Sequence, residues 1–362
     1  MNSPSINTSS SYEKESLIAQ LAVQYATILT KKVFEETEKG TVTKDDESPV
    51  TIGDFGAQAL ISHAIKFNFP EDEIMAEEEA NALKSNSKLA NLVWEKVKYS
   101  NLADPDAQAT LGGQIKSVND MLEAIAIGNS NGHRKGRVWV LDPIDGTKGF
   151  LRGGQYAVCL ALIVDGQVKV GVLGCPNLKF INTESTINDS TPSQTSNREK
   201  GILLSAIEGQ GAICRVLGEG GLTRSSSIRM RTLKDFSKAI FCESVEANHS
   251  SHIDQGKIAV ELGINEPSIR MDSQAKYASL ALGMADIYMR LCVNTSYQEK
   301  IWDHAAGDII VREAGGEVSD YLGNRLDFGQ GRTLAKSKGI IASSRDIHQK
   351  VIDIVQKVLN QE

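Results

Sequence analysis

The sequence is poor in cysteine, in long apolar runs and in positive charge. Five cysteines in 362 residues, none spaced as CxxC, argue against a disulfide framework and a thiolate zinc site. The longest apolar run, at 157–164, is far shorter than the roughly 20 residues of a membrane-spanning helix. Lysine and arginine total 39 against 46 acidic residues, which gives no general reason to bind nucleic acid or an anionic membrane. We therefore expect a soluble, cytoplasmic protein with no nucleic-acid, membrane or obligate protein partner.

Length and composition predict two packed domains behind a polar tail. A chain of 362 residues exceeds the size at which one hydrophobic core usually keeps growing. Residues 1–11 are polar and lack the basic and apolar regions of a secretory signal, so we expect a disordered tail there. Residues 180–200 are dominated by Ser, Thr, Asn and Pro, a composition typical of an exposed connection. We accordingly expect an N-terminal domain at 12–200 and a C-terminal domain at 201–362.

The apolar spacing predicts helices and strands in both halves. Ser10 and Glu13 have capping-box spacing before a long amphipathic pattern, and a second helical pattern starts near Asp54. RVWVL at 137–141 is typical of a buried strand, and 157–173 predicts two strands around an Asp-Gly turn. Apolar runs alternate with helical patterns in the second half. These patterns indicate an α+β first domain and an α/β second domain.

The segment DPIDGT at 142–147 directly follows the predicted strand RVWVL. Pro143 restricts the backbone between the two aspartates and Gly146 allows a turn after them, so Asp142 and Asp145 can converge on one point above a sheet. Hard cations such as Mg²⁺ prefer such oxygen ligands. The alternative is an ordinary turn, because Asp, Pro and Gly are common turn residues.

Two further carboxylates at element boundaries strengthen the metal interpretation. Glu77 follows a short strand pattern, and Asp303 opens a helical one. At this point DPIDGTKGF, the AEE of 76–78 and WDHAAG resemble the lithium-sensitive, magnesium-dependent phosphatase superfamily that includes inositol monophosphatase and fructose bisphosphatase. The three motifs occur in that superfamily's order, and the resemblance runs from about residue 12 to the C-terminus.

The resemblance implies a fold and a set of metal ligands. The implied fold is an α+β and α/β protein, layered as an α-β-α-β-α sandwich of the inositol monophosphatase and fructose bisphosphatase type. Two or three Mg²⁺ ions are implied, with these ligands: the side chains of Glu77, Asp142, Asp145 and Asp303, and the carbonyl of Ile144. Glu78 is the alternative to Glu77, because the family usually has Gly where this chain has Ala76 and three glutamates stand in a row.

The same resemblance pairs Asp54 with Thr147 to activate an attacking water molecule. Bound Mg²⁺ lowers the pKa of such a water and offsets phosphoryl charge, so direct in-line attack needs no covalent phosphoenzyme. Backbone N–H groups at Gly146 and Thr147 are expected to cradle phosphate if a helix starts there. The alternative for Asp54 is structural, because Thr51 and Asp54 also fit a capping box.

Three segments of the second half resemble the 3'(2'),5'-bisphosphate nucleotidase branch of the superfamily. By that similarity His249, Ser273, Lys276 and Arg290 bind the nucleotide, although each alone also has an ordinary structural explanation. The implied substrate is 3'-phosphoadenosine 5'-phosphate, cleaved to AMP and phosphate, together with its 5'-phosphosulfate relative from sulfate assimilation. Inhibition by Li⁺, and also by Na⁺, is implied by the same resemblance.

Two other functions compete with this interpretation. An inositol phosphate or polyphosphate phosphatase shares the metal motifs, which do not specify the leaving alcohol. A catalytically silent nucleotide sensor belongs to a different class, and the intact carboxylate set argues against it.

Overall fold

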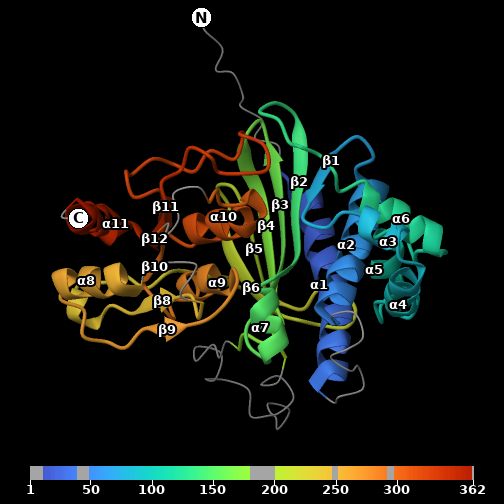
Figure 1. Ribbon diagram of the computed structural model, residues 1–362, viewed down its shortest axis with the longest axis horizontal. Helices are drawn as coiled ribbons and strands as arrows, with labels where there is room; N and C mark the ends of the chain where they lie inside the picture. The colour runs from blue at the N-terminus through green and yellow to red at the C-terminus, as the bar shows by residue number, and fades with distance from the viewer. Residues whose placement is uncertain (1–10, 39–48, 180–199, 247–251, 292–296, 361–362) are drawn as a thin grey trace, which may run out of the picture.

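Two β-sheets alternate with layers of helices in the computed structural model, which describes residues 11–38, 49–179, 200–246, 252–291 and 297–360. From one side to the other, the layers are α8 with α11, a five-stranded sheet, α9 with α10, a seven-stranded sheet, and α1 with α2 (Figure 1). This order confirms the predicted α-β-α-β-α sandwich. The bounds of each element are given below.

The seven-stranded sheet follows chain order from β1 to β7. Its strands are β1 (Glu73–Ala76), β2 (Arg137–Asp145), β3 (Ala157–Val164), β4 (Gln167–Cys175), β5 (Ile202–Ile207), β6 (Gly211–Val216) and β7 (Ser225–Ile228). Only the pair β1–β2 is parallel among these neighbours, and the other pairs are antiparallel. The strand predicted at 137–141 and the two predicted around the Asp-Gly turn are confirmed.

Strand β3 is apolar at every position because both of its faces are buried. Successive side chains of a strand point to opposite faces, and both faces of this sheet are covered by helices. Val158, Leu160 and Leu162 belong to the core beneath α1 (Glu13–Glu38) and α2 (Pro49–Asn68). The alternate residues Ala157, Cys159, Ala161 and Ile163 belong to the core on the opposite face. An unbroken apolar run is therefore a strand buried on both sides.

Helix α2 begins earlier than the sequence pattern suggested. It starts at Pro49, a residue that suits a first helical turn because its missing N–H would be unpaired there anyway. Thr51 and Asp54 lie inside the helix, so the capping-box alternative for this pair is wrong. Ser10 lies outside the described residues. Four shorter helices flank α2: α3 (Asn81–Lys84), α4 (Ser87–Lys98), α5 (Pro105–Thr110) and α6 (Val118–Ala126).

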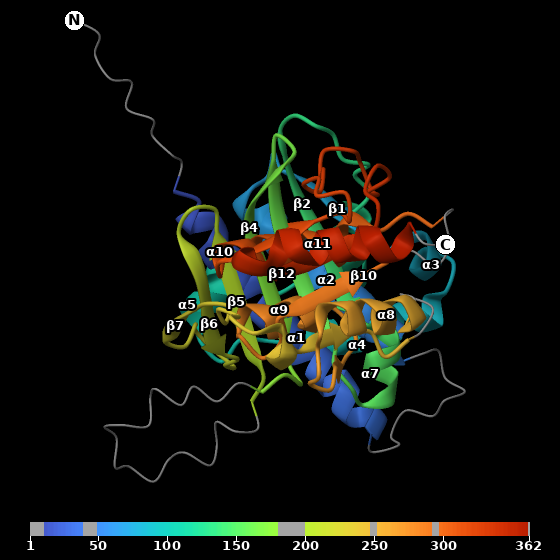
Figure 2. The same cartoon turned by 90° about the vertical axis from the view of Figure 1, so that its left-hand side faces the viewer.

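The five-stranded sheet has the order β11-β12-β10-β8-β9. Its strands are β8 (Phe241–Glu243), β9 (Ile269–Arg270), β10 (Ile287–Arg290), β11 (Gly316–Ser319) and β12 (Ile340–Ser344). Helices α9 (Ala275–Ala281) and α10 (Ala305–Glu313) lie between the two sheets, while α8 (His252–Leu262) and α11 (Arg345–Leu359) cover the outer face. Figure 2 shows α11 running across the front of this sheet. Among the described residues, no helix has the length and apolar character needed to cross a membrane.

The first sheet continues past the expected domain boundary. Strands β5 to β7 pair in sequence onto β4, so a division near residue 200 would cut one hydrogen-bonded sheet in two. We propose instead that the boundary lies after Ile228, with the five-stranded sheet as the centre of the second domain. Residues 1–10 and 180–199, on which the expected tail and connection fall, lie outside the described residues.

Contact between α10 and β4 predicts that Gly171→Ala destabilises the protein. A Cβ atom at Gly171 would lie 2.3 Å from Ile309 Cγ2 and 2.8 Å from the Ala306 carbonyl oxygen. Overpacking of this kind costs about 1–3 kcal/mol of unfolding free energy, measurable by urea denaturation. The matched control is Gly256→Ala in α8, where nothing lies within 4 Å; it is expected to be neutral or to stabilise by up to about 1 kcal/mol. Equal stability of Gly171→Ala and the wild type would contradict this packing.

Candidate active site

A cavity of ≈ 260 Å³ gathers most of the residues that the sequence singled out. Its lining includes Glu77, Asp142, Ile144, Asp145, Gly146, Thr147, Ser273, Lys276, Arg290 and Asp303. Asp54 does not line it, and His249 lies outside the described residues. Residues separated by more than 200 positions therefore meet at one place, between the carboxyl ends of β1 and β2 and the elements that follow β9.

A bulge in β2 aims two carboxylates into this cavity. Asp142 pairs with Cys159 and Asp145 with Ala157, so three steps along β2 oppose two along β3. In a regular strand, residues three apart point to opposite faces. The extra residue of the bulge changes this alternation, so that Asp142 and Asp145 both line the cavity. Pro143, which has no N–H to give to the sheet, is suited to such an irregular position.

Parallel pairing of β1 and β2 brings Glu77 beside Asp142. Ala76 pairs with Leu141, so the next residue of each strand leaves the same edge of the sheet. Gln58 of α2 fixes the adjacent backbone: its Nε2 donates to the Glu78 carbonyl at 2.8 Å, and its Oε1 accepts from the Glu78 N–H at 3.0 Å. Glu77 lines the cavity and Glu78 does not, which favours Glu77 as the ligand.

Gln274 joins the loops that carry Asp145 and Asp303, and the sequence analysis missed it. Its backbone N–H donates to Asp145 Oδ2 at 2.6 Å. Its side chain donates to the Trp302 carbonyl at 2.7 Å and accepts from the Gly307 N–H at 2.8 Å. A glutamine before an apolar helical pattern is visible in the sequence, but its burial and its hydrogen-bond partners are set by tertiary packing.

Burial and mutual repulsion raise the pKa values of the carboxylates in the cavity. Burial, with the charge of Glu78, raises the pKa of Glu77 to about 7. Burial, with the charge of Asp145, raises the pKa of Asp303 to about 7. The pKa of Asp142 rises well above its usual range because of burial and the charge of Glu77. Such a cluster is costly when ionised and unpaired.

The carboxylate cluster fits divalent cations on its own chemistry. One oxygen of Asp142 is buried without a hydrogen-bond partner among the described residues. Burial raises the pKa of Asp145, and the cation of Lys276 opposes that shift. Carboxylates that line one cavity, repel one another and include an unpaired oxygen suit a hard cation such as Mg²⁺. The residues present therefore suit the metal that the resemblance implied.

Asp54 lies behind the cavity, on the face of α2 that packs against β2. The backbone N–H of Ile144 donates to its carboxylate, and its other oxygen, Oδ1, is buried without a partner among the described residues. Burial, together with the charges of Glu78 and Glu77, raises the pKa of Asp54 well above its usual range. Helix α2 also packs against α7 (Thr147–Arg152), which begins at Thr147 and confirms the predicted helix start.

Two cations face the carboxylates from the second half of the chain. Lys276 is only 4% exposed, and burial lowers its pKa while the charge of Asp145 opposes the change. Burial disfavours the charge of Arg290, but neighbouring acidic groups, Glu299 and Asp303 among them, outweigh burial and raise its pKa, so the guanidinium stays charged. The cavity therefore has an acidic wall, formed by Glu77, Asp142, Asp145 and Asp303, and a basic wall, formed by Lys276 and Arg290. This pairing suits a metal-assisted phosphate site.

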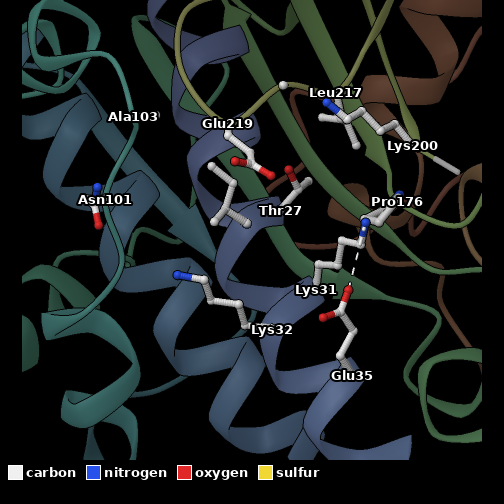
Figure 3. A pocket seen from close by; sticks show the side chains of 13 residues that line it. Thr27, Lys31, Lys32, Glu35, Asn101, Ala103, Pro176, Lys200, Leu217 and Glu219 are labelled. Atoms are coloured by element: carbon white, nitrogen blue, oxygen red, sulfur yellow. Dashed lines mark ion pairs between the residues drawn. The ribbon is translucent and has the colours of Figure 1, made fainter. Parts of the chain in front are cut away.

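A second cavity, ≈ 380 Å³ in volume, opens beside α1 (Figure 3). It is lined by Thr27, Ile28, Lys31, Lys32, Glu35, Asn101, Ala103, Pro176, Lys200, Gly201, Leu217, Gly218 and Glu219. Its charged side chains are exposed, and Lys31 pairs with Glu35 at 3.9 Å. None of the residues predicted from the sequence lies in it. The smaller cavity is the candidate active site because buried charged side chains from both halves of the chain line it.

Comparison with known proteins settles the family. The model of the inositol monophosphatase family matches residues 13–360. The chain belongs to the inositol monophosphatase family. Within it, the chain is 57% identical over 350 residues to 3'(2'),5'-bisphosphate nucleotidase of Emericella nidulans, covering 96% of this chain and 99% of the relative. It is 44% identical over 357 residues to the Schizosaccharomyces pombe protein of the same name, covering 97% and 98%.

Solved structures of the inositol monophosphatase family share the fold. CysQ from Bacteroides thetaiotaomicron aligns with a TM-score of 0.56 at 20% identity, covering 92% of this chain and 98% of that one. Inositol monophosphatase from Anabaena aligns with a TM-score of 0.56 at 17% identity, covering 94% of each chain. At these identities the likeness concerns the layered architecture alone.

Without divalent cations, thermal stability is expected to fall as the pH rises from about 4.5 to about 7.5, the interval between the unfolded and the folded pKa values of Glu77 and Asp303. Glu77 and Asp303, whose pKa values are raised to about 7, must ionise among other carboxylates in this range. A carboxyl group whose folded pKa exceeds its unfolded value stabilises the protein below the unfolded value and loses that contribution as pH rises through the folded one. The melting temperature in EDTA, measured across this range, checks the expectation.

Added Mg²⁺ is the control for this pH dependence. The ion binds the ionised carboxylates, so it should raise the melting temperature more at the upper end of the range than at the lower end. A melting temperature in EDTA that rises steadily with pH would show that the carboxylates do not repel one another in the folded protein.

Proposed function

We propose that the chain is a 3'(2'),5'-bisphosphate nucleotidase that removes the 3'-phosphate of 3'-phosphoadenosine 5'-phosphate, giving AMP and phosphate. Relatives of this name from fungi match over nearly their whole length, and 3',5'-bisphosphate nucleotidase 2 of Arabidopsis thaliana is 38% identical over 356 residues. The observation that carries the proposal is the meeting of an acidic wall and a basic wall in one cavity. We extend the proposal to the 5'-phosphosulfate relative of this substrate.

Two or three Mg²⁺ ions are proposed to bind at the acidic wall. Their ligands would be the side chains of Glu77, Asp142, Asp145 and Asp303 and the carbonyl oxygen of Ile144, all lining the cavity. When bound, the ions would offset the charge of the phosphoryl oxygens and make the attacking water more acidic. Competition by Li⁺, and by Na⁺, at one of these positions is part of the proposal.

Asp54 and Thr147 are proposed to activate the attacking water as a pair. Thr147 lines the cavity and would contact the water, and Asp54, which lies behind the cavity, would accept a proton by way of Thr147. They come from α2 and α7, two helices in contact. The raised pKa of Asp54 makes its carboxylate a stronger base than an ordinary aspartate, which suits proton transfer near neutral pH. Its bond from the Ile144 N–H ties it to the segment that carries the metal ligands.

The basic wall is proposed to hold the nucleotide. Ser273, Lys276 and Arg290 line the cavity opposite the carboxylates, and the backbone N–H groups of Gly146 and Thr147 lie at the start of α7. Arginine offers several N–H donors in one plane, which suits a phosphate oxygen pair. His249 remains in the proposal from the sequence alone.

We also propose that the protein works in the cytoplasm. Cys159, Cys175, Cys214 and Cys242 are buried free thiols, which suits a reducing compartment.

A phosphate-release panel tests the substrate. With Mg²⁺ present, kcat/KM for 3'-phosphoadenosine 5'-phosphate is expected to exceed that for inositol 1-phosphate by at least about 100-fold, because the latter has no second phosphate for the basic wall. Equal or reversed values would support an inositol phosphatase. Tight nucleotide binding without Mg²⁺-dependent phosphate release would support a silent sensor.

Removal of one carboxylate tests the acidic wall. Asp142→Asn keeps the side-chain volume but removes a charge, and kcat is expected to fall by about 100-fold or more. Asp346→Asn, an exposed aspartate at the start of α11, is the matched control and should be unchanged. Nearly normal turnover in Asp142→Asn would remove Asp142 from the metal site. A Li⁺ titration of the wild type should lower activity in a Mg²⁺-dependent manner.

A further inference from the structure

A buried carboxylate, Glu299, lies behind the basic wall without lining the cavity itself. Its Oε1 is 2.8 Å from Arg290 Nε, and its Oε2 is 3.3 Å from His304 Nε2. The other ring nitrogen of His304 is 2.8 Å from the hydroxyl of Tyr277. A chain of polar contacts thus runs from α9, through the turn before α10, to the end of β10.

This cluster is a side-chain network rather than a metal site. Ligand atoms of Glu299, Asp303 and His304 lie within 4.8 Å of one another, a spacing that a metal ion would accept. Both oxygens of Glu299 and both ring nitrogens of His304 already face protein groups, however. A metal ion would have to displace these partners, and Glu299 is better explained by what it does to Arg290.

Glu299 compensates for the burial of Arg290 and fixes its direction. The two side chains are 6% and 12% exposed, so neither charge is well solvated. Arg290 Nη2 is 3.5 Å from the Tyr297 hydroxyl and 3.9 Å from Asp303 Oδ2. Glu299 therefore holds the guanidinium through an ion pair at Nε rather than through a well-aligned hydrogen bond. Nη2 lies nearest to Tyr297 and Asp303, which both line the cavity.

We propose that Glu299 is a positioning residue that aims Arg290 at the non-scissile phosphate of the substrate. The proposal rests on the proposed function, because only a substrate with a second phosphate gives Arg290 an anion to bind. It assigns to Glu299 a specificity role: the ion pair sets the preference for bisphosphates over monophosphates, and the hydrolytic step itself does not use it.

Kinetics with two substrates test this role. Glu299→Gln keeps the shape of the side chain and removes its charge. For 3'-phosphoadenosine 5'-phosphate, KM is expected to rise by about 10-fold or more, because a hydrogen bond to a charged group is being misdirected. For 3'-AMP, which lacks the 5'-phosphate, kcat/KM is expected to stay within about 2-fold. The matched control is Glu261→Gln, which breaks the surface ion pair with Lys357 and should change neither substrate.

A double-variant cycle separates positioning from general stabilisation. Arg290→Ala should raise the KM for the bisphosphate at least as much, and Glu299→Gln added to it should cost nothing further for this substrate, because the two residues act through one interaction. An equal loss on both substrates, or fully additive losses, would overturn the proposal, as would an unchanged KM for the bisphosphate. If Glu299→Gln does not fold, Glu299→Asp must show the selective loss instead.

Failure of the proposed function has a different signature. It appears in the wild type, as hydrolysis of the bisphosphate no faster than that of 3'-AMP or inositol 1-phosphate. That result would reject the role of Glu299 together with the nucleotidase proposal, whereas a wild-type preference with no selective loss in Glu299→Gln would reject the role of Glu299 alone.

Discussion

The mutual repulsion of buried carboxylates is the constraint on which the rest of the site depends. A bulge in β2 brings Asp142 and Asp145 to one side of the strand, and parallel pairing with β1 places Glu77 beside them. Burial raises the pKa of each of these groups; neighbouring carboxylates add to the rise at Glu77 and Asp142, whereas the cation of Lys276 opposes it at Asp145. The backbone thus concentrates negative charge where it is costly, an arrangement that divalent cations would make favourable.

The second half of the chain places two cations on the opposite side of the cavity from these carboxylates. Lys276 and Arg290 face the carboxylates while they are themselves buried, and each has an acidic neighbour, Asp145 and Glu299 respectively. Gln274 ties the two sides together through hydrogen bonds to Asp145 and to the backbone around the WDHAAG motif. Hydrogen bonds therefore link the two sides of the cavity through Gln274.

Motifs predicted the parts of the molecule that spacing can encode. DPIDGT after an apolar strand correctly indicated carboxylates at a strand end and a helix start at Thr147. The start of α2 was misplaced because capping-box spacing looks the same inside a helix as at its end. A polar stretch marks an exposed connection but not the end of a sheet, so the boundary near residue 200 cut through paired strands. Gln274 and Glu299 depend on partners set by tertiary packing, which no local pattern reveals.

Location of the bound ions tests the central claim most directly. Crystals of the protein soaked with Mn²⁺, whose anomalous scattering identifies it, should show peaks in contact with the carboxylates of Glu77, Asp142, Asp145 and Asp303 in the cavity between the two sheets. Peaks confined to other surfaces, or centred on Glu299 and His304 instead, would contradict the account.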